Sequence, residues 1–213
     1  MTDPDDIFYI FTNRLNTMCW HNLRVTKSII SSGFVVASSD VAFHDAYVQG
    51  SAFYAPFVPN PSLPTGFVSS FTVNETANYR VEYDAECARA RHFPLLPSRF
   101  SCVYAFKRAD DCQSVATRYG WPLNTVQRFK LVSNPLNRVH KANMEVVSLM
   151  RGVYAKATWS DDERLKIWTH YWSSYGAFKV EIPIIENDAP IRRSYDSGEI
   201  WEYLVEGRLQ LLE

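Results

Sequence analysis

A chain of 213 residues with 46% hydrophobic and 15% aromatic side chains can bury one sizeable core, and this composition excludes an intrinsically disordered protein. Its 22 basic and 23 acidic side chains give a formal net charge of −1, so no global field steers the protein toward nucleic acid or an acidic membrane. No apolar run is long enough to predict a membrane span, and the acidic start MTDPDDIFYI lacks the features of a secretory signal. We therefore expect a cytoplasmic protein without a membrane partner.

The cysteines and histidines do not predict a metal site. The four cysteines include no C-x-x-C pair, and the five histidines include no H-x-x-x-H pair, which are spacings typical of metal ligands. Without an export signal, we expect the thiols to stay reduced.

The first half of the chain begins with a predicted strand, IFYIFTNRL at 7–15, because β-branched and aromatic residues alternate there. A short helix that ends at Gly33 and a strand, FVVAS at 34–38, are expected next. The stretch 50–78 is rich in proline and interleaved with aromatic residues, which predicts an irregular surface excursion. Residues 75–92 are predicted to be helical, and their basic end suits the helix dipole.

The second half is predicted to continue with a buried strand at 101–106, a helix at 110–119, a strand at 127–133, helices at 143–154 and 161–175, and closing strands at 178–185 and 200–212 around a polar turn at 187–198. Gly120 and Pro122 stop the first of these helices. Strands concentrate at both ends with helices between them, and no β-α-β-α rhythm is present. The fold class is therefore predicted to be α+β rather than doubly wound, in a single domain over residues 1–213.

The closing strand IWEYLVEGRLQLL carries two carboxylates. Alternation places Glu202, Leu204, Glu206 and Arg208 on one face and Trp201, Tyr203, Val205 and Leu209 on the other, which is a plausible core face. One interpretation is a solvated edge strand in which Glu206 pairs with Arg208. The other is that Glu202 lines a polar cleft, because a carboxylate that leaves water needs a partner.

Two further stretches hold candidate binding residues. In LPSRFSCVYAF, the hydroxyl of Ser98 can cap the entry of a strand and Arg99 can face an anion, or the segment is a capped turn with a surface arginine. In the first strand, Tyr9, Thr12 and Arg14 are candidates, and a strand-end arginine can hold a phosphate. Neither G-x-S-x-G, a P-loop nor G-x-G-x-x-G occurs, so a serine hydrolase and the usual phosphate loops are not indicated.

The order of these features resembles the ADP-ribosyltransferase fold: an early aromatic strand with a polar and basic end, a central S-x-x-S strand and a terminal glutamate strand. More narrowly, the segments at 97–120, 139–149, 171–172 and 201–209 resemble an uncharacterised bacterial and phage domain family assigned to that fold. WEYLV also resembles the glutamate strand of the DNA-targeting ADP-ribosyl toxins. The resemblance covers residues 90–213, and the N-terminal half only loosely.

The resemblance implies a split mixed or antiparallel sheet with flanking helices, and a cleft that binds NAD in a bent form. Glu202 corresponds to the catalytic glutamate, which would stabilise positive charge on the ribose as nicotinamide leaves. Ser98 and Ser101 are candidates for the serine strand that braces the site, and Tyr104 or Tyr9 could stack on the nicotinamide.

Arg14 or Arg99 would donate to the pyrophosphate of NAD, with Thr12 on the same first strand. The basic residue that the family places just after a first-strand aromatic has no clean match, because Tyr9 is followed by apolar residues and Arg14 comes late. This departure leaves the role of Arg14 and the register of the first strand open.

The function expected from the resemblance is mono-ADP-ribosyl transfer from NAD to protein, RNA or DNA, by a toxin or phage-conflict effector that works without a metal and has an antitoxin or inhibitor protein as a candidate partner. Two alternatives stay open. The chain could be a non-enzymatic interaction module on a degenerate fold, or it could hydrolyse NAD without an acceptor.

Overall fold

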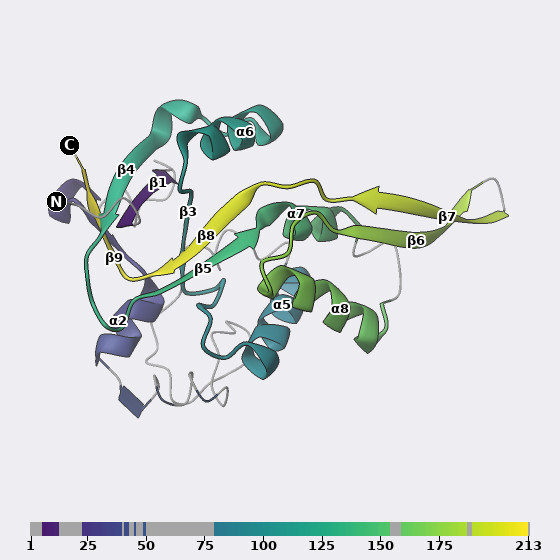
Figure 1. Cartoon of the computed structure of the whole chain (residues 1–213), viewed down its shortest axis with the longest axis horizontal. Helices are drawn as coiled ribbons and strands as arrows, with labels where there is room; N and C mark the ends of the chain where they lie inside the picture. The colour runs from purple at the N-terminus through teal and green to yellow at the C-terminus, as the bar shows by residue number, and fades with distance from the viewer. Residues whose placement is uncertain are drawn as a thin grey trace.

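The computed structural model describes residues 6–12, 23–39, 41–42, 45, 49, 79–153, 159–186 and 189–212 (Figure 1). Arg14 and the predicted excursion at 50–78 lie outside these residues. Helices and antiparallel strands are mixed along the described chain, which confirms the α+β class. Among the described residues, no helix is both long and apolar enough to cross a membrane.

The first sheet, here called sheet A, has four antiparallel strands in the order β1-β4-β9-β2. The strands are β1 (Ile7–Phe11), β4 (Val126–Leu131), β9 (Arg208–Leu211) and β2 (Ser28–Ile30). Sheet A therefore joins segments from the beginning, middle and end of the chain (Figure 1).

The second sheet, sheet B, has three antiparallel strands in the order β3-β8-β5. These are β3 (Val103–Ala105), β8 (Trp201–Glu206) and β5 (Arg138–Asn143). An isolated bridge joins the two sheets, because Tyr9 and Phe106 exchange backbone hydrogen bonds of 2.7 and 2.8 Å.

Gly207 separates β8 from β9, so the predicted closing strand is divided between the two sheets. A Cβ atom at Gly207 would lie 2.6 Å from Leu131 Cδ1 and 2.7 Å from Asn137 Oδ1. Such distances are shorter than van der Waals contact, so a side chain at this position would force Leu131 and Asn137 to move where the chain passes from one sheet to the other.

Three helices cover one face of sheet B: α5 (Tyr79–His92), α7 (Met144–Val153) and α8 (Asp161–Trp172) (Figure 1). Their apolar side chains form one buried cluster with Ala142 and Leu204 of the sheet. A second cluster lies between the sheets, where Phe8 and Phe129 of sheet A pack with Val205 of sheet B. Helix α6 (Ala109–Tyr119) packs near β1 and β4, and α2 (Ser32–Ser39) follows β2.

Local signals explain where two helices begin or end. Gly120 adopts a left-handed conformation with φ 68° and donates its backbone N–H to Ala116, which ends α6 as predicted. Ser160 and Glu163 form a capping box that starts α8. These two helices, together with α5 and α7, confirm the helices predicted at 75–92, 110–119, 143–154 and 161–175, so far as those ranges are described.

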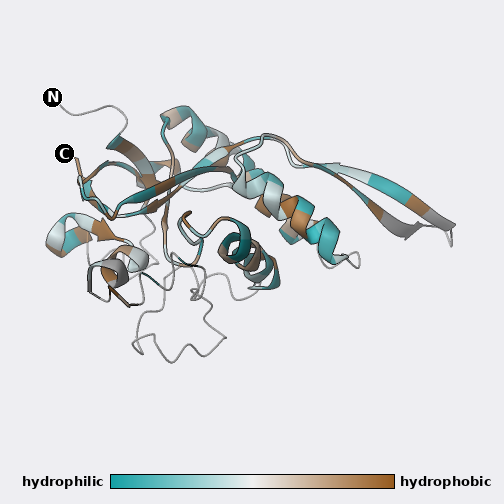
Figure 2. Cartoon of the chain, turned by 60° about the horizontal axis from the view of Figure 1, so that its bottom comes forward, coloured by the Kyte–Doolittle hydropathy of each residue, from teal (hydrophilic) through white to brown (hydrophobic). Residues whose placement is uncertain are grey.

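Three local predictions were wrong. The expected helix that ends at Gly33 is interrupted by β2, because Ser28–Ile30 pairs with β9, and Gly33 lies in the first turn of α2 instead. The expected strand at 34–38 belongs to helix α2, because the strand propensity of its β-branched residues is weaker than the influence of their surroundings. The predicted polar turn at 187–198 contains β7 (Ala189–Asp196), which pairs antiparallel with β6 (Lys179–Glu186). Backbone pairing with β6 outweighs the polar composition of β7, and the two form a ribbon that extends from the body in both views (Figures 1 and 2).

Candidate functional site

The predicted catalytic residue Glu202 lies on β8, the central strand of sheet B, and is only 4% exposed. Its Oε1 atom accepts a hydrogen bond from Arg99 Nη1 at 2.6 Å and another from the Tyr171 hydroxyl at 2.9 Å. No described residue donates to its second oxygen, Oε2. One oxygen of Glu202 therefore fixes the side chain, and the other is not used by the described part of the chain.

Arg99 connects Glu202 to helix α5. Its Nε atom donates to Glu82 Oε2 at 2.7 Å, and Nη1 also donates to the Tyr171 hydroxyl. The guanidinium lies over the rings of Tyr104 and Tyr171, with 4.9 and 5.3 Å between its central carbon and the ring centroids. Arg99 is thus held between two carboxylates and two aromatic rings, which is a favourable environment for a buried guanidinium.

Glu82 receives a second arginine from helix α7, because Arg151 Nη2 donates to Glu82 Oε1 at 2.7 Å. Burial acts to raise the pKa of Glu82, but the charges and hydrogen bonds of Arg99 and Arg151 outweigh it and hold the pKa below its usual value. Burial raises the pKa of the Tyr171 hydroxyl well above its usual value, and the nearby Glu202 raises it further. Tyr171 therefore stays neutral and can donate a hydrogen bond to Glu202.

The two serines of the PSRFS turn (residues 97–101) hold the other carboxylate of β8. Glu206 is 1% exposed, and its Oε1 accepts from Ser101 Oγ at 2.6 Å and from the backbone N–H of Ser98 at 3.1 Å. Arg138 of β5 forms an ion pair with Oε2 at 2.5 Å. Gly33 also lies against this site, since a Cβ atom there would be 2.7 Å from Glu206 Oε1.

Ser98 links Glu206 to a further carboxylate, Glu86 of α5, because Ser98 Oγ donates to Glu86 Oε2 at 2.8 Å. Arg89 donates to Glu86 from Nη2 at 2.9 Å, and Arg89 Nη1 donates to the backbone carbonyls of Pro94 and Leu96. Burial raises the pKa of Glu86, and the charge of Glu206 contributes to the increase. Arg89 and Ser98 therefore fix the turn from both sides.

We call these buried or partly buried acidic and basic residues the charge network. Its members are Glu82, Glu86, Arg89, Arg99, Arg138, Arg151, Glu202 and Glu206. Equal numbers of carboxylates and guanidiniums are present, so the network carries no net charge when all are ionised. Removing one member would leave an opposite charge buried with fewer partners, which is costly in a dry interior.

The structure brings together the predicted residues Ser98, Arg99, Ser101, Tyr104 and Glu202. Their detailed roles differ from the expectation, because both serines bind Glu206 rather than Glu202. The Tyr104 hydroxyl donates to the backbone carbonyl of Arg99 at 2.8 Å, which supports the turn.

The interpretation of the closing strand as a solvated edge was wrong. Glu206 pairs with Arg138, while Arg208 is exposed and its Nη2 lies 3.3 Å from Ser28 Oγ. Both faces of β8 are buried, since Leu204 and Val205 are each 0% exposed. The reason is that β8 is a central strand that has helices on one face and sheet A on the other.

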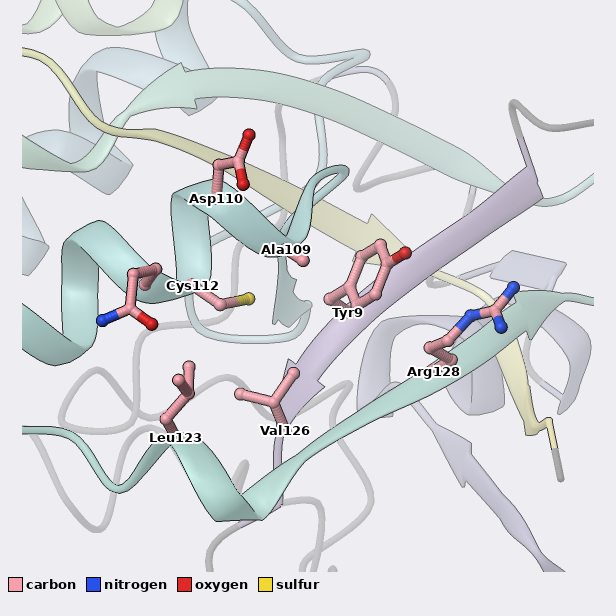
Figure 3. Close-up of a pocket in the computed structure, with 8 residues that line it drawn as sticks. Tyr9, Ala109, Asp110, Cys112, Leu123, Val126 and Arg128 are labelled. Carbon is pink, nitrogen blue, oxygen red and sulfur yellow. The ribbon is translucent and has the colours of Figure 1, made fainter.

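Thr12 and Tyr9 do not contact the charge network in any described hydrogen bond. Thr12 is 6% exposed and donates through Oγ1 to the Thr125 carbonyl at 2.7 Å, so its role is to fix the end of β1. Tyr9 lines a pocket of about 430 Å³ between β1, β4 and α6 (Figure 3), whose lining residues are Tyr9, Ala109, Asp110, Cys112, Gln113, Leu123, Val126 and Arg128.

Sequence reasoning missed the acidic and basic face of α5. Glu82, Glu86 and Arg89 follow the i, i+4, i+7 spacing of one helix face, and Val81 and Ala85 are buried beside them. That spacing next to the small apolar residues was the available signal. Tyr171 was noticed only as part of a resembling dipeptide, and its hydroxyl carried no local signal.

Within the described ranges, His, Cys, Asp and Glu side chains form no group that could hold a metal ion. No protein-family model matches the chain, and no curated protein sequence matches it closely enough to indicate a relationship.

Proposed function

We propose that the protein is a mono-ADP-ribosyltransferase in which Glu202 is the catalytic carboxylate and NAD is the substrate. The observation that carries the proposal is the state of this side chain. Glu202 is held by Arg99 and Tyr171 through Oε1, while no described residue donates to Oε2. A carboxylate fixed in this way can direct its second oxygen to a ribose hydroxyl without a loss of side-chain freedom at the moment of reaction.

In the proposed reaction, the bond between C1′ of the nicotinamide ribose and the ring nitrogen breaks, and its electron pair leaves with neutral nicotinamide. Positive charge develops on the ribose, as in glycoside cleavage. The negative charge of Glu202 stabilises this transition state more than it stabilises the ground state. A nucleophilic atom of the acceptor then bonds to C1′ and releases its proton to solvent.

Arg99 has a different part in the proposal from the pyrophosphate contact expected from the sequence. Its Nε and Nη1 atoms donate to Glu82, Glu202 and Tyr171, so it acts as a positioning residue. The split of the strands into sheets A and B, joined by the bridge between Tyr9 and Phe106, supports the proposed ADP-ribosyltransferase-like sheet. The adjacency of the PSRFS turn to β8 supports it as well.

One observation favours the alternative of a non-enzymatic module. Glu202 is satisfied as a member of a neutral charge network, and such a network can serve stability and fold specificity alone. Under this alternative the carboxylate stabilises the protein and performs no chemistry.

Incubating the protein with NAD labelled in its adenylate part, with and without cell lysate, separates these possibilities. The transferase is expected to place label on a macromolecule, and digestion with protease, ribonuclease or deoxyribonuclease then identifies the acceptor. Release of free labelled ADP-ribose from NAD and water alone would instead indicate a hydrolase. NAD that remains intact with every lysate would contradict both and support the non-enzymatic module.

Glu202→Gln is the decisive variant, because glutamine keeps the shape and one acceptor oxygen for Arg99 and Tyr171. We expect label transfer to fall at least about 100-fold while the protein still folds. Glu199→Gln is the matched control, since Glu199 is an exposed residue just before β8. It should leave the transfer rate unchanged, and thermal unfolding of both variants checks that they are folded.

A further inference from the structure

The outer face of sheet A carries several basic side chains. Phe8, Phe129 and Leu209 of sheet A point into the core between the sheets. Because side chains alternate along a strand, Tyr9, Arg128 and Lys130 point outward. The strand register aligns them: Tyr9 is opposite Arg128, Lys130 is opposite Gln210, and Gln210 is opposite Ser28.

Positive charge on this outer face is not balanced within the sheet. Arg128 and Arg208 are exposed, Lys130 is partly exposed, and none of the three forms an ion pair with a described residue. The four strands β1, β2, β4 and β9 contain no aspartate or glutamate. By contrast, exposed cations of the β6–β7 ribbon face carboxylates, as in the pair of Lys179 and Asp196. We call Arg128, Lys130 and Arg208 the cationic face.

The Arg208 guanidinium lies close to neutral groups of the neighbouring strand and of its own strand. Its Nε and Nη2 atoms lie 3.4 and 3.3 Å from Ser28 Oγ, and Nη2 lies 3.5 Å from Gln210 Oε1. A guanidinium that meets only neutral acceptors keeps its full charge available for an anion. Cations therefore lie on β4 and β9, two adjacent strands of one sheet, rather than at scattered sites.

The pocket beside Tyr9 opens on this same face. Tyr9 and Arg128 are both outward-facing residues of sheet A and both line it, and Figure 3 shows the Tyr9 ring between α6 and Arg128. None of the described aromatic rings stacks on Tyr9. Asp110 and Gln113 of α6 line the pocket too, and they add hydrogen-bonding groups to it. Its volume of about 430 Å³ lies within the range of small-ligand pockets.

We propose that the outer face of sheet A binds single-stranded nucleic acid, with phosphates on the cationic face and one base in the pocket against Tyr9. Single-strand binders combine a basic groove for the backbone with an aromatic side chain on which a base stacks. A carboxylate and an amide in the pocket suit the polar edge of a base. A membrane surface would leave the pocket unused, and an acidic peptide would bring carboxylates against Asp110. This binding does not depend on the proposed NAD chemistry.

The test is fluorescence anisotropy of the full chain with a fluorescein-labelled single-stranded 15-mer, as DNA and as RNA, at low salt. The wild type should bind at least one of the two. Arg128→Glu combined with Lys130→Glu should weaken binding at least about tenfold, because phosphate contacts dominate such affinity. The control is Arg192→Glu combined with Arg193→Glu on β7, which makes the same charge change on another exposed surface and should leave binding unchanged.

Two further measurements sharpen the assignment. With three phosphate contacts, the logarithm of the binding constant should fall with the logarithm of salt concentration with a slope of about −2. Tyr9→Leu should weaken binding about tenfold without changing that slope, because it removes stacking and no charge. Because Tyr9 also packs against α6, Arg128→Gln at an exposed position provides a second variant that should weaken binding and lower the slope.

Several results would overturn the proposal. The proposal is wrong if neither oligonucleotide binds to the wild type, or if both double variants weaken binding equally. It is also wrong if anionic phosphatidylserine vesicles or poly-glutamate compete with the oligonucleotide as effectively as unlabelled single strand does, and if this competition depends on Arg128 and Lys130. Equally tight binding of duplex DNA and of the single strand would exclude a base in the pocket. If the wild type binds the oligonucleotide but transfers no label from NAD, the result contradicts the proposed NAD chemistry and leaves the nucleic-acid proposal supported.

Discussion

The helix-covered face of sheet B and the outer face of sheet A use charged residues in opposite ways. In sheet B, Glu202 and Glu206 are almost fully buried, and each meets an arginine at 2.6 Å or less. In sheet A, Arg128 and Arg208 remain in water without a described carboxylate partner. A buried charge requires a partner within the protein, whereas an exposed charge is solvated by water and remains available to bind a ligand.

This difference teaches where substitutions should affect folding and where they should affect binding. The charge network joins β5, β8, the PSRFS turn and the helices α5 and α7, so its residues are coupled to stability. The charged groups of the cationic face form no ion pair with a described residue, so its residues should be coupled to binding more than to stability.

Arg99→Leu should have the largest effect on stability. It leaves Glu82 and Glu202 buried with fewer partners, and the free energy of unfolding should fall by about 3–5 kcal/mol. Lys179→Leu is the control, since it breaks an exposed pair with Asp196 and should change stability by no more than about 0.5 kcal/mol. Urea denaturation measures both. Equal small changes would mean that the charge network does not stabilise the fold.

His140 of β5 should make stability depend on pH. Burial lowers its pKa from 6.5 to about 4, so the folded state binds fewer protons than the unfolded state between these values. Stability from this group is therefore fully present above pH 6.5 and is lost as pH falls toward 4, by up to about 3 kcal/mol.

His140→Phe keeps a ring beside Trp172, whose centroid lies 5.6 Å from the imidazole. It should reduce the fall in unfolding free energy between pH 6.5 and 4.5. Denaturation at several pH values measures the effect, and an unchanged pH profile in the variant would show that His140 is not its source.

Gly33→Ala should disturb the charge network from outside. The new Cβ would lie 2.7 Å from Glu206 Oε1 and 3.0 Å from Ser101 Oγ, and we expect a loss of about 1–3 kcal/mol. Gly152→Ala is the matched control within helix α7, because its added Cβ would meet no atom within 4 Å apart from the adjoining residues and the backbone of the helix itself. It should increase stability by about 0.5–1 kcal/mol. Thermal unfolding compares the two, and the same sign for both would contradict the close packing of α2 on Glu206.

Arg128→Gln should have the smallest effect on stability. Its side chain is exposed and forms no described ion pair, so unfolding free energy should change by no more than about 0.5 kcal/mol. The same denaturation series provides the measurement. A loss comparable to that of Arg99→Leu would remove the distinction between the two faces.

The parts of the fold that local chemistry determines could be predicted from the sequence. The end of α6 follows from the left-handed Gly120, and the start of α8 follows its acidic first turn. The strand β7 was missed because its residues have low strand propensity. Its structure depends on pairing with β6, which no local pattern reveals.

The candidate site was predictable only in part for the same reason. Alternation placed Glu202 and Glu206 on one face of a strand, but it could not show that both would be buried. Burial of that face depends on α5 and α8, which come from distant parts of the chain. The pairing of Glu82 with Arg99 likewise joins residues 17 positions apart that only the packed helix brings together.

The central claim is that the carboxylate of Glu202 meets the ribose of bound NAD. A crystal structure of the Glu202→Gln variant with NAD, in which the reaction is blocked, tests it most directly. We expect the nicotinamide ribose to lie within hydrogen-bond distance of the side chain at position 202, close to Tyr171 and the PSRFS turn. NAD bound only in the pocket beside Tyr9, or no bound NAD at saturating concentration, would contradict the account.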